Sequence, residues 1–341
     1  MFTIMKYMTK CFVLIPILFL GIQLSASQST DRIMTVKGPV ESSELGFSLT
    51  HEHVMSMFGQ DPHEPGKYDK AAVKAQVLPY LEQIKAMGCS TIMECTAEYF
   101  GRNVNLLLEI SESSGLNILT NTGWYAAAGD RYVPKKAYDL TTAEIADLWI
   151  HEWKHGIQDT GIRPGFIKLG VDNGDFTEID RKLVAAGALA HLETGLTIAV
   201  HTRDNVETAF SQLKILKAVG VHPSAWIWVH AQHAPDAAPL IKAARMGAWI
   251  SLDGIKAPGD VQDHLLDLLN QMKKAGLLDQ VLLSHDGNSF PSGGAIRPYH
   301  HLMETMIPAL RDAGWKEKEI DLMTMKNPAK AFAVRVRSLK H

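Results

Sequence analysis

Short apolar runs alternate with longer amphipathic segments along most of the chain. The runs are rich in Val, Ile, Leu and Thr, as expected of strands buried on both faces. Eight of them occur, at 46–53, 90–96, 116–123, 164–171, 196–202, 225–231, 248–254 and 280–286. Apolar residues between the runs recur at spacings of three and four, which indicates helices, and the segments 70–88 and 178–195 each end in glycine, a helix stop signal.

The alternation of the two kinds of segment predicts an α/β fold. Strand and helix follow one another eight times, which indicates parallel strands joined by crossover helices. Eight such units over roughly 290 residues fit a single-domain (β/α)8 TIM barrel, whose usual length is about 250 residues. An open doubly wound sheet is the alternative, but no GxGxxG follows the first strand and no GxxxxGKS or GxxxxGKT occurs in the chain. We therefore expect the barrel.

The N-terminus differs from the rest of the chain. Lys6 and Lys10 precede or border an apolar stretch, and the small residues SASQS follow it. This is the pattern of a secretory signal peptide, with cleavage expected after Ser27. The apolar stretch is shorter than the roughly 20 residues that a spanning helix needs, although an uncleaved anchor stays open as an alternative. We expect residues 1–27 to be a signal peptide and residues 28–341 to be a barrel domain that is exported to the periplasm or secreted, without membrane attachment after cleavage.

Charge and cysteine content narrow the class further. The 341 residues carry a net charge of −3 and contain no block rich in Lys or Arg, so we expect no nucleic-acid partner. Of the three cysteines, Cys89 and Cys95 remain after removal of the signal peptide. If one strand joins them, their Cα atoms are about 20 Å apart, whereas a disulfide allows about 7 Å. We expect no bridge between them.

Most of the predicted strands end in ionisable residues. Active sites of (β/α)8 barrels lie at the C-terminal ends of the strands, so these residues meet at one rim. They are His51, His53, Lys168, His201, His230 and Asp286. Single histidines at strand ends are commonly packed or hydrogen-bonded, but a lysine inside an apolar strand is costly to bury without a partner. Since imidazole and carboxylate groups are typical metal ligands, the set indicates a metal site.

The same residues and their surroundings resemble the phosphotriesterase family of the amidohydrolase superfamily. The family pattern is HxH on strand one, a lysine on strand four, histidines on strands five and six, and an aspartate on strand eight. All of these positions are filled here, and the framing segments THEH, GIRPGFIKLGVD, VHT, SHD and NPAKAF also match. The resemblance extends from about residue 33 to about residue 336.

The resemblance implies a binuclear metal centre. One ion would be held by strand-one and strand-eight residues and the other by two histidines, with a carboxylated lysine between them. The two ligand sets are His51, His53 and Asp286, and His201 and His230, bridged by a CO2-derived carbamate on Lys168. Burial pushes a lysine amine towards its neutral, nucleophilic form, which suits carbamate formation. Zinc fits these ligands best, with manganese, cobalt or iron as alternatives.

Such a centre implies hydrolysis of a small-molecule ester. A hydroxide bridging two metal ions is a nucleophile at neutral pH, and Asp286 would accept its proton as the catalytic residue. The favoured substrates are lactones and carboxylic esters, with organophosphate triesters or N-acyl amides as alternatives for the same site. A Schiff-base aldolase using Lys168 and a non-catalytic metal-binding barrel are further alternatives. The resemblance also suggests a homodimer.

Four residues near the rim are candidates for substrate binding. Tyr125 occupies a position where lactonase-like members of the family have tyrosine and the namesake phosphotriesterases have tryptophan, which favours an ester or lactone carbonyl over a phosphotriester. A packing aromatic at the barrel rim is the alternative for this ring. His233 and Gly254 depart from the proton relay of the phosphotriesterases. Lys256 and Arg297 could bind an anionic group, or could be solvated surface charges.

Overall fold

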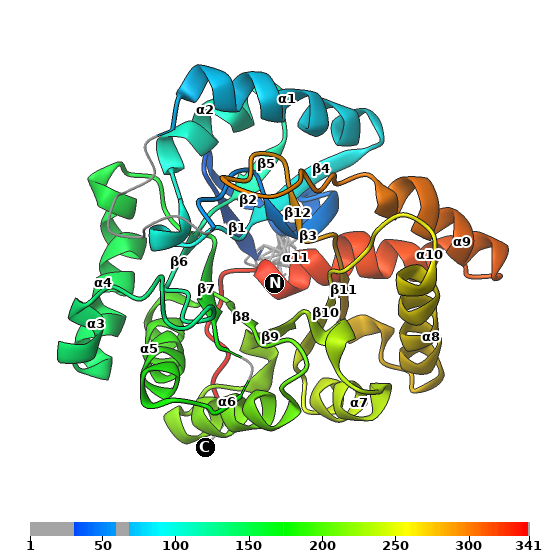
Figure 1. Cartoon of the computed structure of the whole chain (residues 1–341). Coiled ribbons are helices and arrows are strands. Elements are labelled where there is room, and N and C mark those ends of the chain that lie inside the picture. Colours follow the sequence, from blue (N-terminus) through cyan, green and yellow to red (C-terminus); the bar gives the residue numbers. More distant parts are fainter. Residues whose placement is uncertain (1–30, 59–67, 173, 340–341) are drawn as a thin grey trace, which may run out of the picture. The chain divides into compact units, whose positions relative to one another are not determined.

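Parallel strands lie at the centre of the fold and helices pack around them (Figure 1). The computed structural model describes residues 31–58, 68–172 and 174–339, and one compact unit begins at Asp31. Its strands are β1 (Arg32–Thr35), β2 (Gly38–Glu41), β3 (Phe47–His53), β4 (Cys89–Glu94), β5 (Asn117–Leu119), β6 (Asn121–Thr122), β7 (Phe166–Gly170), β8 (Ile198–His201), β9 (Trp226–Val229), β10 (Trp249–Leu252), β11 (Val281–Leu283) and β12 (Gly287–Asn288). Its α-helices are α1 (Lys70–Ala86), α2 (Val104–Ser114), α3 (Lys136–Asp139), α4 (Thr142–His155), α5 (Glu178–Thr194), α6 (Val206–Val219), α7 (Ala237–Arg245), α8 (Asp260–Lys274), α9 (Ile307–Asp312), α10 (Glu317–Asp321) and α11 (Asn327–Phe332).

The strands form eight parallel positions in the predicted order. Hydrogen bonds join them in two sheets, β11-β10-β9-β8-β7-β6 and β12-β3-β4-β5. The sheets are continuous because β5 and β6 are separated by Thr120 alone, and β11 and β12 by a three-residue bend. At that second junction His51 N donates to Ser284 Oγ (2.9 Å) and Asp286 N donates to His51 O (3.1 Å). The structure confirms the (β/α)8 barrel, and each of the eight predicted runs contains a strand.

Local sequence signals account for the helix ends. Thr177 begins α5 with a capping box, accepting from Asp180 N while the Asp180 carboxylate accepts from Thr177 N. Gly195 ends the same helix in the left-handed conformation, with φ 74°. The helices predicted at 70–88 and 178–195 are therefore confirmed, whereas the antiparallel β1–β2 hairpin was not predicted.

Alternation of side chains along the strands decides what fills the barrel. Phe166 and Lys168 share one face of β7, and Ala199 and His201 share one face of β8. Phe166 and Ala199 belong to a buried inner cluster nearer the N-terminal ends of the strands, with Ile33, Met93, Leu119, Ile227, Trp249, Leu282 and Phe332. On these faces, Lys168 and His201 therefore lie two residues closer to the C-terminal ends of the strands than the apolar residues Phe166 and Ala199.

The end of the chain closes the N-terminal end of the barrel. Arg337 Nη1 donates to Thr197 Oγ1 (3.0 Å), just before β8. Its backbone N–H donates to Nε2 of His191 (2.9 Å), near the C-terminus of α5. Arg337 and His191 are both buried, so this region is a packed polar layer beneath the inner cluster.

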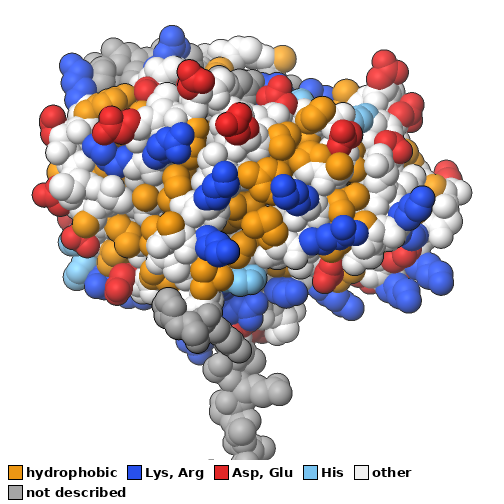
Figure 2. Space-filling model, turned by 90° about the horizontal axis from the view of Figure 1, so that it is seen from below, with side chains coloured by type: hydrophobic (Ala, Val, Ile, Leu, Met, Phe, Trp, Pro, Cys, Tyr) orange, Lys and Arg blue, Asp and Glu red, His pale blue; other side chains and the backbone are white. Residues whose placement is uncertain are grey.

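The outer surface is mixed in character. Figure 2 views the face at the bottom of Figure 1, where α5, α6 and α7 lie, and both acidic and basic side chains occur there among hydrophobic ones. In the described ranges, none of the helices combines the length and apolarity needed to cross a membrane. The predicted signal peptide, residues 1–27, lies outside the described residues. Cys89 and Cys95 are buried free thiols.

Candidate metal centre

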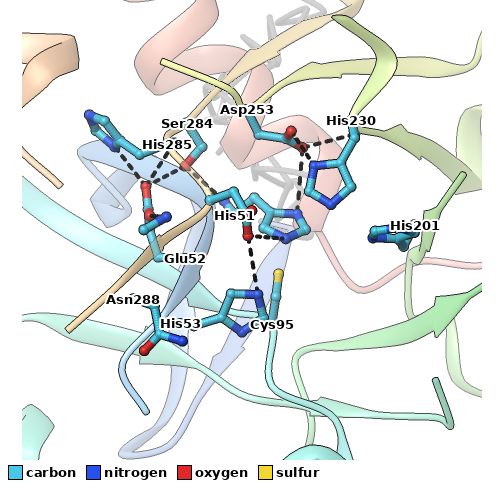
Figure 3. A network of polar contacts seen from close by, with 12 residues as sticks. His51, Glu52, His53, Cys95, His201, His230, Asp253, Ser284, His285 and Asn288 are labelled. Atoms are coloured by element: carbon cyan, nitrogen blue, oxygen red, sulfur yellow. Dashed lines mark hydrogen bonds and ion pairs between the residues drawn. The ribbon is translucent and has the colours of Figure 1, made fainter. Parts of the chain in front are cut away.

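The structure brings the six predicted metal ligands together at the C-terminal ends of the strands. They are His51, His53, Lys168, His201, His230 and Asp286. The rings of His51 and His230 have centroids 4.8 Å apart, and those of His201 and His230 4.5 Å apart (Figure 3). Residues from strands far apart in the sequence thus face one small volume.

His51, His53 and Asp286 form the tightest group. Asp286 Oδ1 lies 3.3 Å from His53 Nε2 and 3.6 Å from His51 Nε2, and one ligand atom from each residue lies within 4.8 Å of the others. His51 Nε2 is buried and has no hydrogen-bond partner among the residues that the structure describes. A buried nitrogen without a partner is uncommon in proteins and calls for an explanation such as an ion.

The hydrogen bonds behind His53 show which of its ring nitrogens carries the proton. The hydroxyl of Thr96 donates to Met55 O (2.7 Å), so it can only accept from His53 Nδ1, at 2.8 Å. Neutral His53 then presents the lone pair of Nε2 to the Asp286 carboxylate. Two acceptors facing each other need a cation between them, and the donor set fits a divalent metal ion.

Asp253, at the end of β10, orients the opposite side of the site. Its carboxylate accepts from His230 Nδ1 (2.7 Å) and from Ser251 Oγ (2.7 Å), and it lies 3.5 Å from His51 Nδ1 (Figure 3). Burial raises the pKa of Asp253, but the contacts with His230 and Ser251 outweigh it, so the pKa is lowered. The ionised carboxylate fixes a proton on His230 Nδ1 and leaves Nε2 free for a metal. Sequence reasoning missed this role, although the aspartate that ends the apolar run AWISLD was a signal for it.

Gln232 and Gly254 complete the surroundings of Asp253. Gln232 Nε2 donates to Asp253 Oδ1 (3.1 Å), and Asp253 N donates to Gln232 Oε1 (3.2 Å). A Cβ atom at residue 254 would lie 2.7 Å from Gln232 Nε2. Glycine at this position therefore leaves room for the amide that supports the aspartate.

Lys168 is a buried amine without an ionic partner. It is 1% exposed, and its Nζ makes no ion pair or hydrogen bond with the residues that the structure describes, lying 5.2 Å from the centre of the Tyr125 ring. Burial lowers its pKa, and nearby acidic groups offset this only in part. The neutral amine that carbamate formation requires is thus favoured.

Asp286 combines a strained backbone with a partly exposed carboxylate. Its φ is 53°, an uncommon value for a residue other than glycine, and its side chain is 33% exposed. Burial tends to raise its pKa, but the adjacent imidazole of His53 and those of His230 and His51 lower it below its usual range. Arg297 donates from Nε to Asp286 O (2.6 Å), and its Nη2 lies 3.4 Å from Asp286 Oδ1.

Glu52 holds the backbone on both sides of Asp286. Its Oε1 accepts from Ser284 Oγ (2.7 Å) and His285 N (3.1 Å) (Figure 3). Its Oε2 accepts from Gly287 N (2.7 Å). Glu52 points away from its neighbours His51 and His53, as alternation along β3 requires. This positioning residue was also missed, because its partners are more than 230 positions away in the sequence.

A cavity of about 180 Å³ opens above the predicted ligands. It is lined by His53, Ser56, Phe58, Phe100, Tyr125, His201, Asp286, Asn288, Pro291, Gly293 and Arg297. The Tyr125 hydroxyl lies 3.1 Å from His201 Nδ1, and its ring stacks on Phe100 with centroids 5.2 Å apart. Two of the predicted substrate residues, Tyr125 and Arg297, therefore face this space.

The other two predicted substrate residues lie elsewhere. His233 is exposed, and the centroid of its ring is 6.5 Å from that of His230. Lys256 is exposed as well. Neither contributes to the lining of the cavity.

The model of the phosphotriesterase family matches residues 31–332. The chain belongs to the phosphotriesterase family. The family implies a binuclear site for divalent metal ions, consistent with the cluster of His51, His53 and Asp286.

Relatives and solved structures of this family are similar along nearly their whole length. The phosphotriesterase homology protein of Escherichia coli K12 is 28% identical over 292 residues, covering 84% of this chain and 98% of the relative. The aryldialkylphosphatase of Saccharolobus solfataricus is 27% identical, covering 87% and 98%, and the N-acetyltaurine hydrolase of Rattus norvegicus is 24% identical, covering 89% and 98%. The structure of the organophosphorus hydrolase from Deinococcus radiodurans has a TM-score of 0.82 at 30% identity and covers 89% of this chain and 98% of its own. The phosphotriesterase-family protein described here is a hydrolase.

Proposed function

We propose that this hydrolase uses two divalent metal ions to cleave lactones or carboxylic esters. The observation that carries the proposal is the set of facing acceptor atoms. Nε2 of His53 and Oδ1 of Asp286 lie 3.3 Å apart, and both are acceptors when the His53 proton is on Nδ1, facing Thr96. Nε2 of His51 is buried and has no hydrogen-bond partner among the described residues. A bound cation removes both conflicts.

The residues divide into two ligand sets joined by one lysine. His51, His53 and Asp286 would hold one ion, His201 and His230 the other, and carboxylated Lys168 would contact both. Zinc is the ion we favour, because neutral imidazole and carboxylate ligands suit it. When bound, such ions polarise a carbonyl or phosphoryl oxygen and lower the pKa of water.

The chain's own groups would move the proton and orient the substrate. Asp286 is ionised and partly exposed, so its carboxylate can accept a proton inside the site and release it to solvent or to the leaving group. The Tyr125 hydroxyl, beside His201, can donate to an oxygen of the substrate. Phe100 and Phe58 supply an apolar wall for an acyl chain.

The names of related proteins support two other bonds as alternative targets of hydrolysis, the phosphotriester bond and the N-acyl amide bond. The aryldialkylphosphatase of S. solfataricus and the organophosphorus hydrolase of D. radiodurans support triester hydrolysis as a second candidate. The N-acetyltaurine hydrolases support hydrolysis of an N-acyl amide. Tyr125 in the cavity is the feature for which we place the carbonyl ester first.

Export and dimer formation are part of the proposal. Residues 1–27 have the character of a signal peptide, and we infer a periplasmic or secreted protein. A homodimer acting on a small molecule is the assembly that the family resemblance suggests.

Metal analysis of the purified mature protein tests the proposal. Wild type, Lys168→Ala and His201→Ala would be compared, with Lys154→Ala, an exposed lysine near the end of α4, as the matched control. Hydrolysis of a lactone, an aryl ester, an N-acyl amino acid and paraoxon would be measured in parallel. About two metal ions per chain, lost together with ester turnover in the first two variants only, is the expected result. Metal-free protein that borohydride inactivates in the presence of a carbonyl compound would instead identify Lys168 as a Schiff-base residue.

A further inference from the structure

We propose that Arg203 binds an anionic group of the substrate, at a subsite beside the metal centre. This inference rests on the proposed hydrolytic function and specifies its substrate class: an ester or lactone carrying a second, negatively charged oxygen group. Neither the family pattern in the sequence nor the predicted substrate residues included Arg203.

Arg203 is held firmly at the rim. It follows the predicted ligand His201 by two positions and has a left-handed backbone, with φ 54°. Its N–H donates to Val229 O (3.3 Å), and its carbonyl accepts from Trp228 Nε1 (2.9 Å). Strained backbone conformations that surrounding contacts maintain are concentrated at functional sites.

The side chain of Arg203 is half-buried and lacks an acidic partner among the residues that the structure describes. Its Nε is buried and unbonded, and across the described ranges no carboxylate lies within ion-pair distance of its guanidinium. A partly desolvated guanidinium gains from hydrogen bonds to an acceptor of opposite charge. An anionic ligand would supply the missing acceptors, in the two-pronged geometry that guanidinium favours.

The position of Arg203 connects it to the metal centre. It lines a hollow of about 280 Å³ that shares Phe58, Tyr125 and His201 with the cavity above the ligands. A small substrate can therefore place its reacting group over the predicted ligands and a second group near Arg203. The acid in this hollow, Asp172, is already engaged, because its two oxygens accept from Ala128 N (2.6 Å) and Gly129 N (2.7 Å).

The other basic candidates are less suited to this role. Arg297 already contacts the carbonyl and the carboxylate of Asp286. Lys256 is exposed and lines neither hollow. Of the two arginines that line these hollows in the described part of the chain, Arg203 is the one without an acidic partner.

Matched esters test the inference. The metal-loaded full-length mature protein would be assayed with 4-nitrophenyl butanoate, which is neutral, and with mono-4-nitrophenyl glutarate, which carries a carboxylate. The variants are Arg203→Ala and Arg203→Lys, with Arg245→Ala as control, since Arg245 is exposed at the C-terminal end of α7. We expect Arg203→Ala to reduce the ratio of kcat/KM values, glutarate ester over butanoate, by about 10- to 100-fold. Arg203→Lys should retain part of the preference, and Arg245→Ala all of it.

Calorimetry gives a readout that does not depend on turnover. Glutarate, 3-sulfopropanoate and inorganic phosphate would be titrated separately into wild type and Arg203→Ala, with butanoate as the singly charged reference. Binding of one of the first three that is at least about tenfold weaker in Arg203→Ala supports the subsite and identifies the preferred anion. Equal binding by both proteins, or binding no tighter than that of butanoate, overturns it.

The two hypotheses fail in different ways. If wild type hydrolyses both esters and the ratio is unchanged in Arg203→Ala, the subsite is wrong and the hydrolytic function stands. If neither ester is hydrolysed by metal-loaded protein, the ester-cleaving function is wrong. The calorimetric comparison then decides the subsite alone.

Discussion

Both ends of the barrel bury histidine and basic side chains, but the hydrogen bonding of these side chains differs between the two ends. At the N-terminal end, His191 has both ring nitrogens bonded: Nδ1 lies 2.8 Å from Leu196 O, and Nε2 accepts from Arg337 N at 2.9 Å. At the C-terminal end, His51 is equally buried, but in the described part of the chain its Nε2 has no hydrogen-bond partner. Burial alone therefore does not distinguish a structural histidine from a ligand. What distinguishes the two is whether both ring nitrogens have hydrogen-bond partners.

The buried basic side chains of the two ends differ in the same way. Arg337 donates to the Thr197 hydroxyl and to backbone carbonyls of Lys330, Ala331 and Ala333. Lys168, at the other end, has no hydrogen-bond acceptor among the described residues. A buried basic group whose hydrogen bonds are complete stabilises the fold, whereas one without hydrogen-bond acceptors is available for chemistry. Substitutions at the two ends should accordingly separate activity from stability.

The largest effect is expected from Asp286→Asn. The change removes both a predicted ligand and the group we propose as proton acceptor, so ester hydrolysis should fall by about 10²- to 10⁴-fold and the metal content should fall with it. Asp279→Asn, at an exposed aspartate before β11, is the control. A variant that keeps both its metal and its rate would contradict the assignment of Asp286.

The next largest effect is on stability, at the opposite end. Arg337→Ala leaves several buried acceptors without a donor and should lower the free energy of unfolding by about 3 kcal/mol. Metal content per folded chain should be unchanged. Urea unfolding measures the first quantity and metal analysis of the folded fraction the second. Arg335→Ala, which removes a half-exposed pair with Asp31, should cost less than about 1 kcal/mol.

Asp253→Asn should have an intermediate effect confined to the metal end. The carboxylate that fixes the proton on His230 is lost, and residues in this position typically change metal affinity by about 10- to 100-fold. Competition with a chelator of known affinity measures the change. Ser251→Ala, which removes one donor to the same carboxylate, should shift the affinity less. Equal affinity in wild type and Asp253→Asn would mean that Asp253 has only a structural role.

Much of this arrangement could be predicted from the sequence. Each strand of the barrel lies in a short apolar run, and the predicted ligands lie near the ends of such runs, except Lys168, which is the central residue of β7. The period-two alternation of strands then places Lys168 and His201 inside the barrel. Both inferences depend on local pattern, which the sequence displays directly.

The rest depends on contacts between distant segments. In the sequence, nothing distinguishes Glu52 from the other polar residues of THEH. In the structure, its carboxylate accepts a hydrogen bond from Gly287 N, 235 positions later. Arg337 near the chain end and Arg203 beside a ligand look like ordinary surface charges in the sequence. For His233 and Lys256 the sequence misled in the opposite direction. Both lie shortly after barrel strands, but neither lines the cavity. Only the packing of the loops decides which of these side chains face inward.

The smallest predicted effect is a pH dependence of stability at the N-terminal end. Burial lowers the pKa of His191 to about 4, from an ordinary value of 6.5. The folded protein therefore favours neutral His191, and this stabilisation is complete above pH 6.5 and declines as the pH falls towards 4. At pH 5.5 the loss should be about 1 kcal/mol. His191→Gln, unfolded in urea at several pH values, should lack this part of the acid sensitivity, whereas His155→Gln, at an exposed position in the last turn of α4, should behave as wild type. If the free energy of unfolding changes with pH identically in all three proteins, His191 is not held neutral by the fold. The proposed difference in hydrogen bonding between the two ends of the barrel would then have no measurable effect on stability.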